Sequence, residues 1–268
     1  MKHFMEIAGR RMAYLDEGQG PVLLFGHSYL WVSAMWVPQV EALKSSYRCI
    51  VPELWGHGDS DSLPEGPCSL ETLARHHLAL LDALDIEECV LVGLSIGGMW
   101  GVELARMAPA RLKGVVLMDT FVGWEPQIPC ERYLGMLAMI EQLGTLPAPV
   151  IEQVAPLFFA HEPDPALMSG FKARLASWPA DQVASLVAVG RSFVTREDRI
   201  EWLEEMAMPS LVMTGCEDKA RPVLEGYLMA EALACPFKEI PAAGHISTLE
   251  NPEFVNRTLA EFLAGLQG

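Results

Sequence analysis

The sequence predicts an α/β protein with a mostly parallel, eight-stranded sheet, helices on both faces and an inserted helical cap. Short apolar segments typical of buried strands alternate with amphipathic segments typical of helices. The alternation stops over residues 121–195, which are helical in pattern, punctuated by proline and rich in Met, Leu and Phe. The 268 residues suffice for one large domain with an insertion. We therefore expect a core formed by residues 1–120 and 196–268, and a cap formed by residues 121–195.

The expected strands are short and either apolar throughout or rich in β-forming residues. They cover residues 5–7, 11–15, 22–25, 47–51, 88–94, 114–118, 210–214 and 237–240. The expected helices cover residues 36–43, 69–84, 96–107 and 222–234, and a last helix starts with Asn251 as its N-cap and Pro252 at its first position. Since ligands of such sheets bind at the carboxyl ends of the strands, the site is expected there, beneath the cap.

Composition narrows the class of partner. Nineteen basic against 35 acidic residues give a formal net charge of −16, which argues against nucleic acid and anionic membranes as partners. The N-terminus lacks a long apolar core and no 18-residue apolar run is present, so we expect neither a signal peptide nor a membrane span. The six cysteines form no C-x-x-C pair or metal-ligand spacing. A cytoplasmic protein with no bound metal is the expectation, and the sequence leaves its oligomeric state open.

A short glycine–serine pattern is the strongest indication of chemistry. Gly93-x-Ser95-x-Gly97 lies between a strand-like and a helix-like segment, which predicts a nucleophile elbow. In such a tight turn β-carbons beside the serine would collide, and glycine relieves this. The hydroxyl would be exposed at a helix N-terminus, where free N–H groups favour negative charge. Because the pattern also occurs by chance, its meaning depends on partners elsewhere in the chain.

A serine nucleophile needs a base and a carboxylate that orients the base. Among seven histidines, His245 alone falls in the expected loop between the last strand and the last helix. Asp218 follows the strand at residues 210–214 and is the preferred acid, and the order Ser95, Asp218, His245 is the one that this architecture requires. Asp119, at the end of another strand, is the alternative acid.

The charge that develops on the substrate oxygen needs backbone donors. One is the N–H of Ile96, directly after the nucleophile, and the other is expected from the loop after the third strand. We choose Tyr29 in that loop, with Ser28 as the one-residue alternative. His27 and His57, which lie in loops after strands, are interpreted as structural hydrogen-bonding residues.

These motifs together resemble the α/β-hydrolase family, and the resemblance spans nearly the whole chain. It is based on Gly26-His-Ser-Tyr29, Glu53-Leu-Trp-Gly-His-Gly-Asp-Ser60, Gly93-Leu-Ser-Ile-Gly-Gly98, Asp198 with Pro209–Asp218, and Gly244–Phe254. Ser28 stands where glycine is common, and Glu53 replaces the usual aspartate in a loop that we interpret as structural. The nearest subgroup looks like small bacterial esterases, enol-lactonases and cofactor-free perhydrolases. The resemblance implies an acyl-enzyme mechanism without a cofactor, while Ser95 argues against dehalogenases and epoxide hydrolases, which use aspartate.

The expected substrate is a small to medium uncharged ester, because aromatic and Met residues over the strand ends would form an apolar pocket. Trp31, Phe121, Trp124 and Phe158 are the predicted substrate-binding residues. Lactone opening, C–C bond hydrolysis and perhydrolysis by the same three residues remain open. So does a non-catalytic binding protein that keeps the fold.

Overall fold

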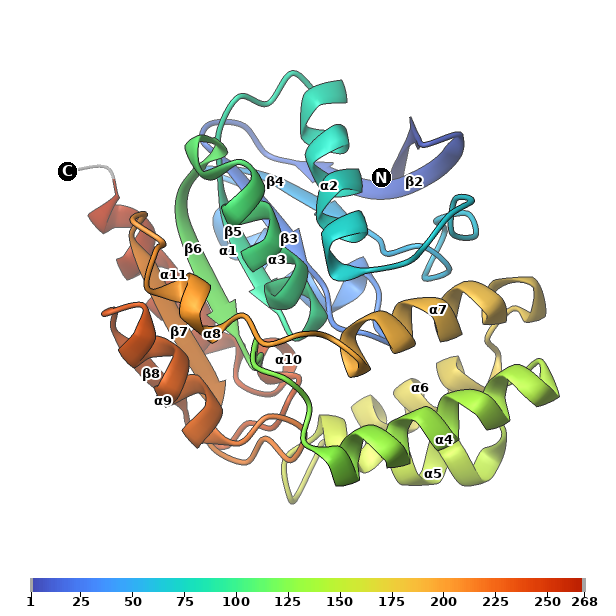
Figure 1. Cartoon of the computed structure of the whole chain (residues 1–268). Coiled ribbons are helices and arrows are strands. Elements are labelled where there is room, and N and C mark those ends of the chain that lie inside the picture. The colour runs from blue at the N-terminus through green and yellow to red at the C-terminus, as the bar shows by residue number, and fades with distance from the viewer. Residues whose placement is uncertain (1, 267–268) are drawn as a thin grey trace.

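A single eight-stranded sheet forms the centre of the computed structural model, which describes residues 2–266 (Figure 1). Its strand order is β1-β2-β4-β3-β5-β6-β7-β8, with β1, β2 and β4 joined antiparallel and all other neighbours parallel. The strands are β1 (Lys2–Ile7), β2 (Arg10–Glu17), β3 (Val22–Gly26), β4 (Arg48–Pro52), β5 (Cys89–Leu94), β6 (Leu112–Met118), β7 (Ser210–Gly215) and β8 (Phe237–Ile240). The predicted fold class is confirmed.

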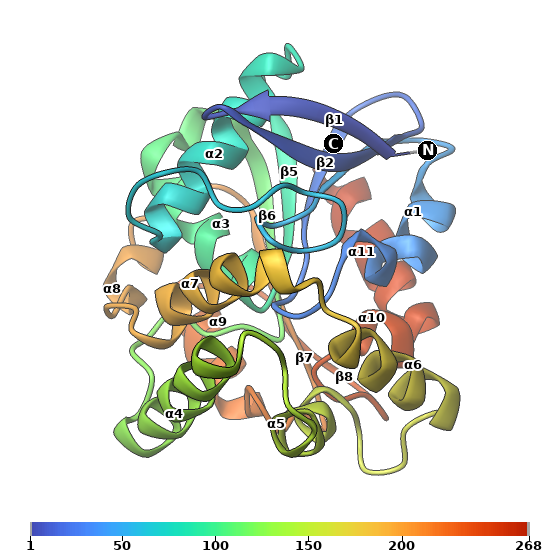
Figure 2. The same ribbon diagram turned by 90° about the vertical axis from the view of Figure 1, so that its right-hand side faces the viewer.

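Helices cover both faces of the sheet. They are α1 (Val37–Leu43), α2 (Leu70–Ala83), α3 (Ile96–Met107), α8 (Ile200–Leu203), α9 (Val223–Ala232), α10 (Ser247–Glu250) and α11 (Pro252–Gly265). Figure 2 shows α2, α3 and α8 on one face and α1 and α11 on the other. Two helices begin where the sequence predicts, each at a side-chain N-cap: Ser69 accepts a hydrogen bond from the Thr72 N–H at the start of α2, and Asn251 accepts one from the Phe254 N–H at the start of α11.

A second group of helices lies between β6 and α8 in the sequence. It consists of α4 (Gln127–Leu143), α5 (Ala148–Val154), α6 (Pro165–Ala176) and α7 (Val183–Val194). Two short 3₁₀ turns, Ala155–Phe158 and Ala180–Gln182, lie among these helices, and two more, Ser33–Trp36 and Pro109–Arg111, lie earlier in the chain. Figure 1 shows α4–α7 gathered at the end of the sheet toward which the arrowheads of β6 and β7 point. They therefore cover the edge at which the ligand site is expected.

The core follows the apolar runs of the central strands. Leu23, Leu24 and Phe25 of β3 and Val116 of β6 are fully buried, as expected of strands that are covered on both faces. Complete burial of each such side chain contributes about 1.5–3 kcal/mol. These strands therefore form a rigid floor for the residues that follow them.

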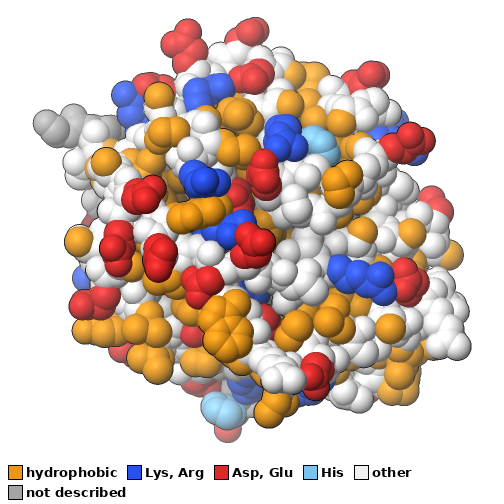
Figure 3. All heavy atoms as spheres, viewed as in Figure 1, with side chains coloured by type: hydrophobic (Ala, Val, Ile, Leu, Met, Phe, Trp, Pro, Cys, Tyr) orange, Lys and Arg blue, Asp and Glu red, His pale blue; other side chains and the backbone are white. Residues whose placement is uncertain are grey.

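Over residues 2–266, no helix combines the length and hydropathy needed to cross a bilayer. Acidic and basic side chains are interspersed over the face shown in Figure 3. All six cysteines are free thiols, and burial raises the pKa of Cys49 and Cys89 to about 12, which makes both unreactive.

Candidate active site

Ser95 occupies a sharp turn between β5 and α3. Its φ of 57° and ψ of −122° lie in a strained region for a non-glycine residue. The glycines around it cannot carry side chains, because a β-carbon on Gly97 would overlap the backbone of Gly26 and one on Gly93 would overlap that of Gly97. Such close backbone contacts hold β3, β5 and α3 together at this point. The turn has the geometry of the predicted nucleophile elbow.

His245 and Asp218 form a hydrogen-bonded pair. The His245 Nδ1 lies 2.8 Å from the Asp218 Oδ2, and both side chains are almost completely buried. The other oxygen of Asp218 accepts hydrogen bonds from the N–H groups of Ala220 and Arg221 at 2.8 and 2.9 Å. These bonds fix the carboxylate, so that the imidazole ring is oriented through its Nδ1.

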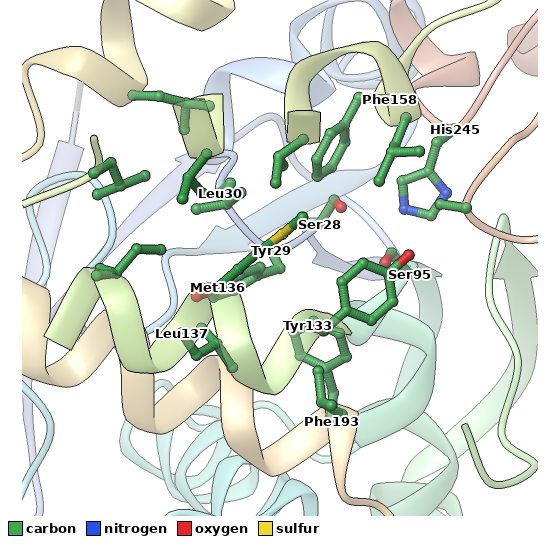
Figure 4. Close-up of a pocket in the computed structure, with 18 of the residues that line it drawn as sticks. Ser28, Tyr29, Leu30, Ser95, Tyr133, Met136, Leu137, Phe158, Phe193 and His245 are labelled. Carbon is green, nitrogen blue, oxygen red and sulfur yellow. The ribbon is translucent and has the colours of Figure 1, made fainter. Parts of the chain in front are cut away.

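Ser95 and His245 line one pocket, and Figure 4 shows both side chains at the same end of it. Phe158 packs edge-on against the imidazole, with ring centres 5.3 Å apart. The Ile246 N–H donates to the Phe158 carbonyl at 3.0 Å, which ties the histidine loop to the inserted helices. The structure thus brings Ser95, His245 and Asp218 to one site with an apolar wall.

Asp119 lies in the same region but has different partners. Its Oδ1 accepts from the Gly215 N–H at 2.7 Å, and its Oδ2 accepts from the Ser247 hydroxyl at 2.5 Å. Burial, together with the charge of Asp218, raises the pKa of Asp119 well above its usual value. Of the two predicted acids, Asp218 contacts His245, whereas Asp119 joins the ends of β6 and β7 to the loop of Ser247.

Hydrogen bonds to the Ser28 carbonyl, in the loop after β3, fix the direction of the Tyr29 N–H. The Ser28 carbonyl is engaged by His27 Nδ1 at 2.8 Å and by the Trp31 N–H at 3.1 Å. Because the C=O and N–H of one trans peptide point in opposite directions, the Tyr29 N–H points away from these partners. It makes no hydrogen bond within the described chain, whereas the N–H groups of Ser28 and Leu30 donate to Met35 and His57.

The Ile96 N–H is a second backbone donor without a partner in the described chain. The Ser95 carbonyl accepts from the N–H groups of Gly98 and Met99 and from the Thr120 hydroxyl. The Ile96 N–H of that peptide therefore points out of the helix N-terminus, and residues 2–266 offer it no hydrogen-bond acceptor. Two backbone donors thus remain free beside Ser95, one at Tyr29 and one at Ile96.

Two neutral histidines hold the loop of Tyr29. Burial lowers the pKa of both His27 and His57 to about 3. The Nε2 atoms accept from the N–H groups of Leu54 and Leu30, so each Nδ1 carries the proton and donates to a carbonyl, that of Ser28 or Trp55. Both residues are structural, as the sequence analysis indicates.

We expect these histidines to make stability depend on pH. In the unfolded chain each binds a proton near pH 6.5, but in the fold only near pH 3, so unfolding takes up protons between those values. Their contribution to the free energy of unfolding is complete above pH 6.5. It decreases as the pH is lowered from 6.5 toward 3, by up to ~1.4 kcal/mol per pH unit for each residue. Urea unfolding of the wild type and of His57→Gln over this range measures it. Identical slopes in the two proteins would contradict the assignment.

The pocket beside Ser95 is lined mainly by hydrophobic side chains. Its empty space is about 830 Å³, including the part open to solvent. The lining residues from the inserted segment are Tyr133, Met136, Leu137, Ile140, Leu146, Val150, Ile151, Val154, Leu157, Phe158, Leu175, Phe193 and Val194. Those from the rest of the chain are Ser28, Tyr29, Leu30, Ser95, Met99, Ala220, Arg221 and His245. Phe158 is the one predicted substrate-binding residue among them.

The assignment of Trp31, Phe121 and Trp124 to the pocket is corrected. Trp31 is buried and stacks on Phe171, with ring centres 4.7 Å apart and planes 8° apart. Phe121 is half-buried and folds back over Gly123, and Trp124 is 58% exposed. Aromatic content alone could not distinguish residues that face the pocket from those that pack elsewhere or face solvent.

Most of the pocket wall on α4 was not predicted from the sequence. Tyr133, Met136, Leu137 and Ile140 line the pocket, and their spacing places them on one face of a helix. This i, i+3, i+4, i+7 pattern is visible in the sequence and is the signal that could have found them. A single Met or Trp is a weaker indication than a helical face.

A buried charge cluster was also missed. Glu125 accepts from Arg196 Nη1 at 2.9 Å and from Arg221 Nη2 at 2.6 Å. Glu125 precedes α4, Arg196 follows α7, and Arg221 belongs to the Asp218 loop. The chain segments that enter and leave the inserted helices are therefore joined to the loop that holds His245. Removing one member would leave a buried charge unpaired, which typically costs about 3–5 kcal/mol.

Glu53 has the structural role expected of its loop. It is fully buried and accepts hydrogen bonds from the Ser33 hydroxyl at 2.6 Å, the Asp59 N–H at 2.8 Å and the Lys2 ammonium at 2.9 Å. These bonds satisfy the carboxylate inside the protein. The substitution of aspartate by glutamate thus leaves the loop anchored.

Comparisons with known proteins agree on the fold. Residues 21–252 match the model of the family described as the alpha/beta hydrolase fold. The 3-oxoadipate enol-lactonase 1 of Acinetobacter baylyi is 26% identical, over 92% of this chain and 90% of that protein. A haloalkane dehalogenase of Sphingobium indicum is 31% identical, over 99% of this chain and 96% of its own length. A thermophilic esterase of Thermogutta terrifontis has a TM-score of 0.90 and 27% identity, with both chains covered completely.

Proposed function

The chain belongs to the α/β-hydrolase family, and on that premise we propose that it is a serine hydrolase that cleaves small to medium uncharged carboxylic esters. The proposal depends on one observation above all. A strained serine at a helix N-terminus shares a pocket with a histidine whose ring is bonded to a buried carboxylate. These are the residue types and roles that acyl transfer to a serine requires.

In the first half of the proposed reaction, the Ser95 Oγ attacks the ester carbonyl carbon while His245 Nε2 takes the hydroxyl proton. Asp218 holds the tautomer with the proton on Nδ1 and stabilises the imidazolium that forms. The carbonyl oxygen gains negative charge between the free N–H groups of Tyr29 and Ile96. The tetrahedral intermediate then collapses, and the imidazolium gives its proton to the leaving alcohol.

In the second half, water replaces the alcohol. His245 takes a proton from this water as it attacks the acyl carbon, and the same two N–H groups hold the oxyanion. Collapse returns the proton to Ser95 and releases the carboxylic acid. Phe158, which packs edge-on against the imidazole, forms an apolar wall beside the reacting groups.

The pocket wall supports an uncharged substrate with an apolar group. Hydrophobic side chains from residues 121–195 form most of the lining. Arg221 is the charged exception, and it is already paired with Glu125 at 2.6 and 2.8 Å. A substrate carboxylate would have to compete with this buried partner, whereas a hydrocarbon group gains from burial.

Lactone hydrolysis is the second candidate. Two of the relatives, both from Acinetobacter baylyi, carry the name 3-oxoadipate enol-lactonase and are each 26% identical over 92% of this chain. A lactone is an internal ester, so the same attack by Ser95 would open it without any change in the site. The haloalkane dehalogenase relative does not favour dehalogenation here, because Ser95 stands where the dehalogenases of this fold use aspartate.

Steady-state kinetics with p-nitrophenyl esters and simple lactones of graded chain length test the proposal. We expect kcat/KM for the esters to rise with acyl length up to a medium chain, by roughly tenfold for each pair of methylenes that enters the pocket. Leu137→Trp, which fills the pocket wall, should shift the optimum to shorter acyl chains. A lactone series that is consistently faster than the esters would favour the second candidate, and a wild type inert toward both would favour a binding protein.

A further inference from the structure

One polar group in the pocket has no part in the mechanism above. The Ser28 side chain is 0% exposed and lines the same pocket as Ser95 and His245, and its hydroxyl makes no hydrogen bond within the described chain. Figure 4 shows the three side chains around the same end of the pocket. A buried hydroxyl without a partner destabilises a fold. Among the described residues, Ser28 carries the one such hydroxyl that lines this pocket, which places it within reach of a bound substrate.

The hydroxyl does not support the local structure. The Ser28 N–H donates to Met35 Sδ at 3.3 Å, and the carbonyl is held by His27 Nδ1 and by the Trp31 N–H. The backbone of this residue is therefore fixed by bonds that an alanine would make equally well. What serine adds at this position is one further O–H donor on the wall of the pocket that holds Ser95 and His245.

We propose that the Ser28 hydroxyl is a third oxyanion donor, which acts with the N–H groups of Tyr29 and Ile96; this inference rests on the proposed function. An ester offers two oxygens near Ser95. Its leaving oxygen must face His245 to receive a proton, which places the carbonyl oxygen on the side of the loop that carries Ser28 and Tyr29. In the tetrahedral intermediate the former carbonyl oxygen holds the electron pair of the broken C=O π bond, and the Ser28 hydroxyl donates a hydrogen bond to this oxygen. Its own O–H bond stays intact, and the pair re-forms the carbonyl when the intermediate collapses.

This role predicts a specific kinetic effect. A donor directed at the oxyanion acts more strongly in the transition state than in the bound ester, so its loss lowers kcat and leaves KM nearly unchanged. Loss of one donor in such a site lowers kcat on the order of 100-fold. Because the free hydroxyl is unpaired in the fold, its removal should leave the melting temperature unchanged or raise it.

The test compares Ser28→Ala with Thr214→Val. Thr214 in β7 also has a buried hydroxyl without a partner, but it lies outside the pocket, so its removal should leave kcat unchanged. The measurements are kcat and KM for p-nitrophenyl esters, the Ki of an alkyl boronic acid that forms a tetrahedral adduct on Ser95, and Tm. For Ser28→Ala we expect kcat and boronate affinity to fall together, by on the order of 100-fold, at an undiminished Tm. Ser28→Gly gives the same comparison if the alanine variant does not fold.

Three results would overturn the assignment. One is a Ser28→Ala protein with unchanged kcat. Another is a loss of activity that varies with the leaving group while boronate affinity is kept, which would place the hydroxyl on the departing oxygen. The third is a fall in Tm that accompanies the fall in kcat, which would make the residue structural. Ser95→Ala separates these from failure of the proposed function, because an active Ser95→Ala enzyme would refute the function itself.

Discussion

Ser95→Ala and His245→Ala are each expected to lower kcat/KM for a p-nitrophenyl ester by about 10⁵-fold, and the double variant to be hardly slower than either. The reason is that the hydroxyl is nucleophilic only when the imidazole takes its proton, so each residue is ineffective without the other. Steady-state kinetics of the two single variants and the double variant, with Tm as the control for folding, measure the coupling.

Additive losses in the double variant would contradict this account, because they would mean that the two side chains act independently. Substantial activity in either single variant would also contradict it. Thr214→Val serves as the matched control for a buried hydroxyl removed elsewhere in the core.

Asp218→Asn is expected to lower kcat by on the order of 10³- to 10⁴-fold, and Asp119→Asn by less than about tenfold. An amide at position 218 would donate to His245 Nδ1 and so favour the wrong tautomer of the ring. At position 119 the amide oxygen can still accept from the Gly215 N–H, and the Ser247 hydroxyl can turn to accept from the amide nitrogen. Single-turnover kinetics of the two variants, which isolate the acylation step, measure the difference.

The opposite ranking would move the acid to Asp119. Equal losses in both variants would indicate that the two carboxylates act as one coupled unit, which their proximity and the raised pKa of Asp119 make a meaningful alternative. Tm values are needed here as well, because Asp119 joins three segments of the chain.

The strand and helix pattern was predictable because burial on both faces leaves a continuous apolar run. Val22–Gly26 and Cys89–Leu94 are such strands, and both were expected within a residue or two. Caps were equally readable, since Ser69 and Asn251 satisfy N–H groups that any helix start leaves free. The division of the chain into a core and a cap at residues 121 and 195 stays a prediction.

The site was predictable only where local geometry restricts the residue type. The tight turn around Ser95 admits glycine alone at positions 93 and 97, so the sequence retains a readable pattern. Asp218 and His245 were found from their positions after strands, although Asp119 satisfies the same rule. What separates the two acids is three-dimensional, namely the direction in which each carboxylate points.

The pocket was harder to predict, because many hydrophobic residues of the inserted helices pack on one another and not on a ligand. Trp31 is conspicuous in the sequence, yet it stacks on Phe171 away from the cavity. The Glu125–Arg196–Arg221 cluster joins residues up to 96 positions apart, a distance over which no local pattern exists. Such contacts depend on how the helices cross, which composition does not determine.

Mass spectrometry of the acylated protein shows whether Ser95 is the residue that takes up the acyl group. The wild type, mixed rapidly with excess p-nitrophenyl ester and quenched in acid, is expected to gain the mass of one acyl group on the peptide that contains Ser95. Release of one equivalent of p-nitrophenol should accompany this gain, and Ser95→Ala should show neither. Hydrolysis of the ester by wild type with no adduct on that peptide, or an adduct on another residue, would contradict the account.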